Sequence, residues 1–326
     1  MNRATAIAHP NIAFIKYWGQ ADAALHLPAN PSISMVLDCL QTRTTVGFVE
    51  GLREDEVIID GVAASAAARV RVGEHLDRVR ALAGSALRAR VRSENNFAAG
   101  AGLASSASAF AALTLAATAA LGLQLSLEQL SALARLGSGS ACRSVPAGFV
   151  EWTVRPDRSS AAHSIAPPDH WALCDCIALV STRQKRVSSI DGHRAAPSSP
   201  LYAARVQDAA RQVPACRTAI ERRDLAALGQ IMERDAVMMH AVAMTSDPPV
   251  YYWTPETMRV VQAVVDWRAT GLPVYYTIDA GPNVHCLCEA AHCDEMQRRL
   301  GLLPGVQQVL VAGPGNGARL TDDDLL

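Results

Sequence analysis

Lysine is almost missing from this chain, because only Lys16 and Lys185 are lysines among its 30 lysines and arginines. Arginine therefore serves wherever a general positive charge is enough, and a remaining lysine indicates a place where a compact ammonium is needed. The chain also lacks an excess of positive or negative charge, since its 30 basic and 31 acidic residues give a net charge of −1. No overall field favours nucleic acid or an anionic membrane, so any anion has to be bound locally.

Long apolar runs are missing as well. No stretch approaches the roughly 18 apolar residues that a membrane-spanning helix needs, and the N-terminus lacks the basic and apolar regions of a secretory signal. We therefore expect a cytoplasmic protein that binds neither membranes nor nucleic acid. With 326 residues, of which 50% are hydrophobic, the chain is long enough for one large domain or two ordinary ones.

A zinc-type CxxC motif is missing from the eight cysteines, which are scattered along the chain. The densest group runs from His285 to Cys293 and could suggest a site for a soft metal. However, Cys286 and Cys288 alternate with His285 and Leu287 as residues of a strand do. We therefore expect reduced core thiols, with no disulfide and no metal ion held by protein ligands.

Short apolar runs and long periodic ones alternate along the chain, which predicts an α+β protein. The first half opens with strands up to Val46 and continues with a strand at 56–59, helices at 63–87, 103–121 and 127–136, and a loop at 93–101. The second half alternates strands at 173–180, 274–278, 284–288 and 307–312 with helices at 201–213, 225–239, 255–270 and 291–300. We place the domain boundary in the polar stretch 155–169, which gives domains 1–170 and 171–326.

A loop of glycine and serine precedes the helix that we expect at 103–121. Its glycines, Gly100 and Gly102, let the backbone approach an anion, while the hydroxyls of Ser105 and Ser106 and the start of the helix favour negative charge. The loop is not a Walker A motif, because no Lys-Ser or Lys-Thr pair closes it. The pattern predicts phosphate binding, with close helix packing as the alternative.

Three further clusters combine polar groups with charge. Ser138, Ser140 and Arg143 suit a bound phosphate or carboxylate, although a flexible surface turn would look similar. Lys16 interrupts a strand-like run and needs an anionic partner wherever it is buried. Asp279 stands on a Gly-Pro turn at the end of the strand at 274–278, where such residues often only shape the turn. Together, Lys16 and Asp279 offer an ammonium and a carboxylate for proton transfer.

Where these clusters occur in order, the chain resembles the diphosphomevalonate decarboxylases of the GHMP kinase superfamily. The resemblance rests on the motifs Asn11-Ile12-Ala13 with Lys16-Tyr17-Trp18-Gly19, Asn95-Asn96-Phe97, Gly102 to Ala107, Gly137 to Arg143, Gly148 to Trp152, Met239-His240-Ala241 and Asp279 to Asn283. It implies a GHMP kinase fold: an N-terminal domain like domain 2 of ribosomal protein S5, with a left-handed β-α-β unit, and a ferredoxin-like C-terminal domain.

The resemblance also implies the reaction and the residues that carry it. ATP, with Mg2+, phosphorylates the tertiary C3 hydroxyl of a phosphorylated mevalonate, and phosphate then leaves as carbon dioxide is lost. Asp279 would deprotonate or orient the hydroxyl beside Lys16, and Arg143 with Asn11 would hold the substrate carboxylate. The substrate phosphate would be bound by Tyr17, Ser138 and Ser140, and the nucleotide by Asn95, Gly102, Ser105, Ser106, Lys185 and Ser188.

The chain departs from the family pattern at two cationic positions. Gln20 stands where the family usually has a second lysine, and Ile190 stands where it has an arginine; Ala98, in place of a proline, affects only loop stiffness. Both cations would lie near the phosphate tail, so their loss favours 5-phosphomevalonate as substrate, with isopentenyl phosphate as product. Other cationic side chains could compensate, namely Arg183, Arg186, His193 and Arg194.

Three alternatives remain beside the monophosphate decarboxylase. The first is a diphosphomevalonate decarboxylase that makes isopentenyl diphosphate. The second is a mevalonate 3-kinase, which the presence of both Asp279 and Lys16 disfavours. The third is a regulator without catalysis, which would be expected to have lost its phosphate loops or its acid. We also expect a homodimer whose partner is only the small-molecule substrate.

Overall fold

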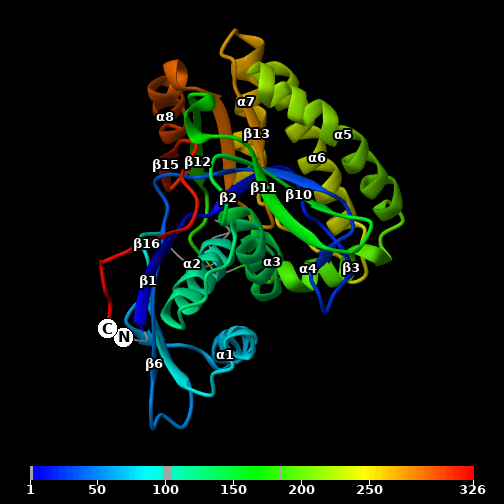
Figure 1. Cartoon of the computed structure of the whole chain (residues 1–326). Coiled ribbons are helices and arrows are strands. Elements are labelled where there is room, and N and C mark those ends of the chain that lie inside the picture. The colour runs from blue at the N-terminus through cyan, green and yellow to red at the C-terminus, as the bar shows by residue number, and fades with distance from the viewer. Residues whose placement is uncertain (1–2, 98–104, 184) are drawn as a thin grey trace.

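The computed structural model describes residues 3–97, 105–183 and 185–326. Figure 1 shows the elements of these residues as an α+β protein with several sheets. Elements of the first half are β1 (Arg3–Ala8), β2 (Asn11–Ile15), β3 (Gln20–Asp22), β4 (Leu27–Pro28), β5 (Ser32–Val36), β6 (Thr42–Val49), β7 (Glu56–Ile59), β8 (Val62–Ala63), α1 (Ala66–Ala83), β9 (Arg88–Asn95), α2 (Ser105–Ala120), α3 (Leu127–Gly137), a 3-10 helix (Gly139–Ser144), β10 (Phe149–Val154) and β11 (Ser160–Ala166).

The elements of the second half begin at Leu173. They are β12 (Leu173–Leu179), α4 (Ser189–Ala195), α5 (Tyr202–Arg222), α6 (Leu225–Met244), α7 (Pro255–Ala269), β13 (Tyr275–Thr277), β14 (Val284–Glu289), α8 (Cys293–Gly301), β15 (Gln308–Ala312) and β16 (Arg319–Thr321); the short 3-10 helices at 168–170, 196–198 and 290–292 complete them. The helices and strands predicted for this half are confirmed, with α5 and α6 extending further than their predicted ends.

A six-stranded sheet in the order β16-β1-β6-β9-β7-β8 is covered by α2, and α1 and α3 pack against α2. Strands β7 and β9 are parallel and α1 connects them, which makes a β-α-β unit. The core between sheet and helices includes Val46, Leu76 and Phe110. Capping residues bound the helices: Ser65 starts α1, and the Ser126 side chain forms a capping box with Gln129 at the start of α3.

Two four-stranded sheets enclose α5 and α6. One sheet has the order β11-β10-β5-β2 and the other has the order β13-β14-β12-β15. Their shared core includes Phe14, Phe149, Ile177, Leu228 and Met232. The second sheet is antiparallel throughout, and its strand order is that of a ferredoxin-like fold built from β12, β13, β14 and β15. Helices α7 and α8 cover its other face.

Two predicted loops contain strands. Residues 93–95 belong to β9, and the polar stretch 155–169 contains β11, which pairs with β10. The alternation of β11 is irregular, whereas β9 alternates clearly and its last residues, 93–95, were taken for the start of the loop. The division into domains 1–170 and 171–326 stays a prediction. The final strand β16 lies beside β1 of the first sheet, so the last residues return to the first half of the chain.

One pair of cysteines differs from the expectation of reduced thiols. A disulfide joins Cys174 on β12 to Cys293 at the start of α8, 119 positions later, and the other six cysteines are free. The spacing of the cysteines does not reveal this pair, because the contact depends on α8 folding back over the sheet. The prediction that every cysteine is reduced is therefore wrong for these two residues.

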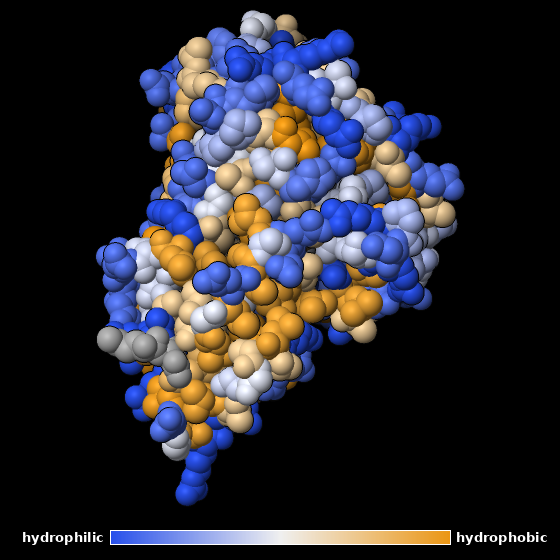
Figure 2. Space-filling view, in the orientation of Figure 1, coloured by the Kyte–Doolittle hydropathy of each residue, from blue (hydrophilic) through white to orange (hydrophobic). Residues whose placement is uncertain are grey.

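The surface carries polar and apolar regions. Figure 2 shows hydrophilic residues over α7, α8 and the outer part of α5, and apolar residues gathered lower on the same face, around α2 and α3. Among the described residues, helices that combine the length and the hydropathy of a membrane span are not found.

Candidate active site

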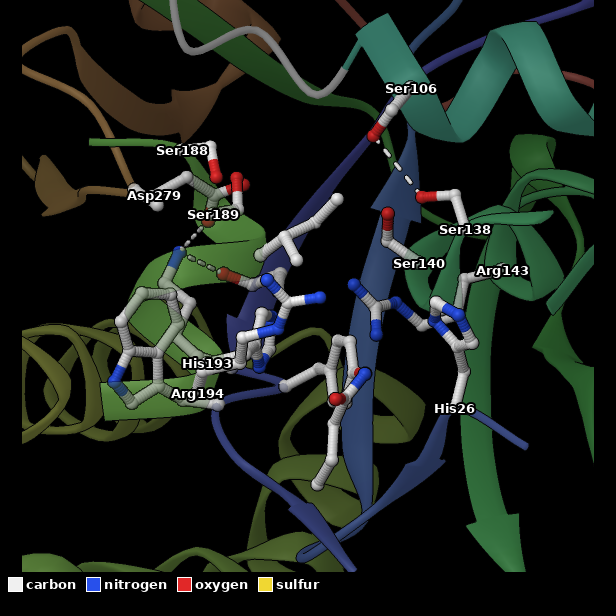
Figure 3. A pocket seen from close by; sticks show the side chains of 18 of the residues that line it. His26, Ser106, Ser138, Ser140, Arg143, Ser188, Ser189, His193, Arg194 and Asp279 are labelled. Carbon is white, nitrogen blue, oxygen red and sulfur yellow. Dashed lines mark hydrogen bonds and ion pairs between the residues drawn. The ribbon is translucent and has the colours of Figure 1, made fainter. Parts of the chain in front are cut away.

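A cavity of about 310 Å3 lies where β2, α2, the 3-10 helix, α4 and the turn after β13 meet. It brings together most of the predicted site residues, namely Asn11, Lys16, Tyr17, Ser105, Ser106, Ser138, Ser140, Arg143, Lys185, Ser188 and Asp279. Figure 3 shows Ser138, Ser140 and Arg143 on one side of the cavity, with Asp279, Ser188 and Ser189 on the opposite side.

Lys16 and Asp279 form an ion pair at the edge of this cavity. The Lys16 Nζ donates to Asp279 Oδ1 at 2.6 Å and to the carbonyl of Ala13 at 2.7 Å. Burial opposes the charged form of Asp279, but the positive charges of Lys16 and Arg143 and the hydrogen bond from Lys16 outweigh it and hold the pKa of this carboxyl below its ordinary value. Asp279 is therefore a carboxylate at neutral pH and is able to accept a hydrogen bond or a proton.

The backbone of Lys16 is clamped by three buried side chains that the sequence reasoning missed. Its N–H donates to Asp235 Oδ2 at 2.7 Å, and its carbonyl accepts from Arg205 Nη2 at 2.7 Å and from Asn30 Nδ2 at 2.9 Å. Arg205 also donates to both oxygens of Asp235, at 2.9 and 3.1 Å. This clamp fixes where the ammonium of Lys16 points.

The sequence of α6 contains an indication of this clamp, because a charged residue interrupts an apolar row. Asp235 falls in the buried row of α6 formed by Leu228, Met232 and Met239, where an apolar residue is expected. A charged residue in an apolar row needs a buried partner. The row predicts that a partner exists but does not say which residue supplies it.

Arg143 is buried and aimed by neutral groups. Its Nε donates to Asn11 Oδ1 at 3.2 Å, its Nη1 donates to Ser32 Oγ at 2.8 Å, and its guanidinium lies 5.7 Å from the ring centre of Trp152. Burial is the main cause that lowers the pKa of Arg143. Asn11 donates in turn to Ser144 Oγ at 2.8 Å. Asn11 therefore engages both ends of its amide in the protein, which suits it to orient Arg143.

The serine cluster at 138–144 is a buried 3-10 helix and not a flexible surface turn. Ser138 Oγ donates to Ser106 Oγ at 3.2 Å and so connects this helix with the start of α2 (Figure 3). Gly139 lies against Tyr17, whose ring carbon would be 2.6 Å from any Cβ at that position. The close approach explains the glycine and places the hydroxyl of Tyr17 beside the serines.

Lys185 and Ser188 lie on the Asp279 side of the cavity. The Lys185 Nζ donates to Ser189 Oγ at 2.7 Å and to the carbonyl of Ala280 at 2.8 Å. Burial lowers the pKa of Lys185 to about 8, and Asp279 partly offsets this effect. Ser188 caps α4, because its hydroxyl donates to Asp191 Oδ2 and accepts from the Asp191 N–H.

Two residues that we predicted to bind the nucleotide are not found in the described lining of the cavity. Asn95 does not line the cavity as far as the structure describes it; its side chain accepts from Thr42 Oγ1 at 2.7 Å and donates to Asp60 at 3.2 Å. Gly102, with the rest of the loop 98–104 and the substituted Ala98, lies outside the described residues. The assignment of both residues to the nucleotide stays a prediction.

The two positions that lost a cation also lie at the cavity. Gln20 Nε2 donates to Tyr17 OH at 2.7 Å. Ile190 and Arg194 both line the cavity and lie one turn apart on α4, so they share a face of that helix. His193 accepts the Gly19 N–H at 2.9 Å, and burial lowers the pKa of His193 to about 3, so it is neutral.

Of the four proposed compensating residues, His193 and Arg194 line the cavity, whereas Arg183 and Arg186 are not in its described lining. Sequence reasoning also missed two basic or imidazole side chains of the lining, His26 and Arg71. Arg71 donates to the carbonyl of Gly137 at 3.1 Å. The lining thus keeps positive charge through arginines that no motif pointed to.

Family models match nearly the whole chain in two consecutive parts. Residues 8–166 match the diphosphomevalonate decarboxylase-like N-terminal domain, and residues 176–308 match the mevalonate 5-diphosphate decarboxylase C-terminal domain. The chain belongs to the diphosphomevalonate decarboxylase family. Similar relatives include the diphosphomevalonate decarboxylase of Aspergillus fumigatus, 39% identical over 86% of this chain and 75% of its own length, and the human one, 35% identical over the same two shares.

Solved structures of the family agree with the fold. The mevalonate diphosphate decarboxylase of Enterococcus faecalis is 37% identical, with a TM-score of 0.91 over 98% of both chains. That of Staphylococcus aureus is 35% identical, also with a TM-score of 0.91 over 98% of both. A third structure, MDDEF in complex with MVAPP, AMPPCP and magnesium, is 38% identical with a TM-score of 0.92 over the same shares. The prediction of the GHMP kinase fold is confirmed.

Proposed function

We propose that this chain catalyses the ATP-dependent decarboxylation of diphosphomevalonate, giving isopentenyl diphosphate, carbon dioxide, ADP and phosphate. The observation that carries the proposal is one cavity in which the carboxylate of Asp279, paired with Lys16 at 2.6 Å, shares the lining with the guanidinium of Arg143. The relatives support the diphosphate rather than the monophosphate that Gln20 and Ile190 favour, because they are diphosphomevalonate decarboxylases.

Asp279 would act on the tertiary hydroxyl of the substrate. Its carboxylate orients that hydroxyl and takes its proton when the oxygen attacks a phosphoryl group. Its lowered pKa makes it a weak base, which suits phosphoryl transfer, because positioning and charge stabilisation dominate the loose transition state. Lys16 keeps the carboxylate ionised and balances the charge that develops beside it.

Arg143 would hold the carboxylate of the substrate in a fork geometry. In the second step the bond between C2 and the carboxylate carbon breaks. Its electron pair forms the C2–C3 double bond while the C3–O bond breaks and phosphate leaves with the oxygen. Asn11 and Ser32 keep the guanidinium in one orientation, so that the carboxylate stays aligned with the leaving phosphate.

The described lining fits a nucleotide polyphosphate with Mg2+. Ser105 and Ser106 lie at the start of the 16-residue helix α2, and Lys185 directs an ammonium to the same cavity. These three residues would hold the phosphates, and the hydroxyls of Ser106 and Ser138 would face the metal. When bound, ATP supplies the phosphoryl group that turns the C3 hydroxyl into a leaving group, and Mg2+ neutralises phosphate charge.

The phosphate tail of the substrate would lie near Tyr17, Ser138 and Ser140. Arg194 extends from α4 on the face that also carries Ile190, so it can supply the cation that Ile190 lacks. An arginine one turn further along a helix reaches the same region, because residues four apart are neighbours. The diphosphate therefore retains a cationic partner despite the two substitutions.

The deciding experiment gives the purified enzyme ATP, Mg2+ and, in turn, mevalonate, phosphomevalonate and diphosphomevalonate, and measures ADP and carbon dioxide separately. We expect equal release of both products, with the highest kcat/KM for diphosphomevalonate. A higher kcat/KM for phosphomevalonate would establish the monophosphate enzyme. Release of ADP without carbon dioxide would establish a kinase, and release of neither would contradict the proposal.

We further expect a homodimer. Light scattering coupled to size-exclusion chromatography would then give twice the 34.6 kDa of one chain. A mass of 34.6 kDa at micromolar concentration would contradict it.

A further inference from the structure

Five cysteines lie on one face of the sheet β13-β14-β12-β15, the face that α7 and α8 cover. Strand β12 carries Cys174 and Cys176, and the neighbouring strand β14 carries Cys286 and Cys288. The antiparallel register puts Cys174 opposite Cys288, and Cys176 opposite Cys286. All four belong to the core that packs beneath α7 and α8, and Cys293, the first residue of α8, packs against it. Strands β12 and β14 thus form a cluster of thiols, and helix α8 covers it.

The sulfur atoms of this cluster are close enough to share one ion. The Sγ of Cys176 lies 3.6 Å from that of Cys174 and 3.9 Å from that of Cys293, and the ligand atoms of these three residues all lie within 4.8 Å of one another. Cys288 stands opposite Cys174 in the register of β14 and β12 and belongs to the same core, so it can supply a fourth sulfur. A tetrahedral zinc site with Zn–S bonds of about 2.3 Å separates its sulfurs by roughly 3.8 Å.

We propose that Cys174, Cys176, Cys288 and Cys293, when all are reduced, form a tetrathiolate site for one zinc ion. The site pins α8 to β12 and β14, and it is separate from the catalytic cavity, whose described lining contains none of these four residues. Cys293 lies at the N-terminus of α8, where the helix dipole stabilises a thiolate. Cys293 is also partly exposed, which gives a metal ion a path to the site.

The disulfide between Cys174 and Cys293 is the metal-free, oxidised form of the same cluster. A dithiol or phosphine reductant supplies the two electrons, and water the two protons, that convert the disulfide into two thiols while the reductant is oxidised. Binding of Zn2+ then releases the protons of the ligating thiols to solvent. Metal and disulfide therefore exclude each other, since both use Cys174 and Cys293.

The test uses the full-length protein reduced with a phosphine and then freed of reductant. Reduction is verified by titrating thiols after denaturation, with eight expected for the reduced chain and six for the disulfide form. Cobalt(II) is added as a probe, because tetrahedral thiolate coordination gives it intense visible bands, and zinc is then added to displace it. We expect one cobalt per reduced chain, displaced by one zinc, and no binding to the disulfide form.

Two variants and one control make the result specific to these ligands. Cys176→Ser and Cys288→Ser leave the disulfide partners in place and should each abolish the tetrathiolate spectrum and lower metal affinity by at least about 10-fold. Cys216→Ser removes a buried thiol of another core and should leave one cobalt per chain. Circular dichroism and decarboxylase activity confirm that the variants fold. The proposal is overturned if the chain with eight free thiols gives no thiolate bands, or if both variants bind cobalt like the parent protein.

Discussion

The ammonium of Lys16 and the carboxylate of Asp279 meet at 2.6 Å although 263 positions separate them in the chain. Lys16 follows the end of β2 in the first half, and Asp279 stands on the turn after β13 in the second half. The ion pair thus assembles only when both halves have folded and docked. Its formation couples catalysis to the integrity of the whole fold.

Replacing Asp279 by Asn should abolish decarboxylation, because an amide does not accept the proton of the C3 hydroxyl. We expect kcat to fall by at least about 100-fold, the lower end of the contribution of a general base. Nucleotide binding, measured by fluorescence of a labelled ATP analogue, should change little. A variant with parent-level release of carbon dioxide would remove the role assigned to Asp279.

Replacing Arg143 by Lys keeps the positive charge but removes the fork that reaches Asn11 and Ser32. We expect kcat/KM for diphosphomevalonate to fall by about 10- to 100-fold, the loss of one charge-assisted hydrogen bond. Asn11→Ala should produce part of this loss. In the double variant the two effects should not add, since Asn11 acts through Arg143. Fully additive losses would show that Asn11 binds substrate independently.

Replacing Arg194 by Ala should impair the diphosphate more than the monophosphate. The expected loss in kcat/KM is about 10-fold for diphosphomevalonate and smaller for phosphomevalonate, because in the proposed function the removed cation would face the outer phosphate. Arg183→Ala is the matched control, since Arg183 is not in the described lining of the cavity. Adding Ile190→Arg to the Arg194→Ala variant should restore the preference. Equal losses for both substrates would contradict this role.

Lys185 should produce an alkaline limb in the pH profile of kcat/KM for ATP. Burial lowers its pKa to about 8, so the ammonium is present below that pH and is lost as the pH rises through it. Affinity for phosphates should therefore fall above about pH 8. In Lys185→Arg the limb should move beyond the measured range, because a guanidinium stays charged. An unchanged limb in this variant would assign the titration to another group.

Replacing Arg205 by Ala should destabilise the protein, because it leaves Asp235 buried without its partner. Removing one partner of a buried ion pair costs about 3–5 kcal/mol in the free energy of unfolding. Urea denaturation measures this loss. Arg211→Ala removes an arginine whose side chain is 72% exposed and should change stability by less than about 1 kcal/mol. Similar stabilities of the two variants would show that the clamp on Lys16 contributes little.

The sequence predicted most of the residues that line the cavity but not the residues that hold them in position. The residues that the motifs assign to ligands line one cavity, as far as they are described and apart from Asn95. The residues that hold them do not occur in motifs: Asn30, Arg205 and Asp235 come from a loop and two helices, and only packing brings them to Lys16. Helices were easier to predict than polar strands, as β11 shows, because a strand depends on a partner elsewhere in the chain.

The preference for a monophosphate came from Gln20 and Ile190, with Arg194 among the residues named as possible compensation. Ile190 lacks a cation, but Arg194 occupies the same face of α4 one turn later. Residues four apart on a helix lie on the same face, so a cation at the later position can reach the same region. A comparison of motifs at fixed positions does not detect such a shift.

The pairing of β16 with β1 has a consequence for how the protein is made. Residues 319–321 supply an edge strand next to residues 5–7, so the sheet is complete only after residue 321 has been synthesised. Nascent chains released early would expose the edge of β1 to other strands. We therefore expect that fusions or truncations at the C-terminus reduce soluble yield more than changes of equal size in the loop after β10.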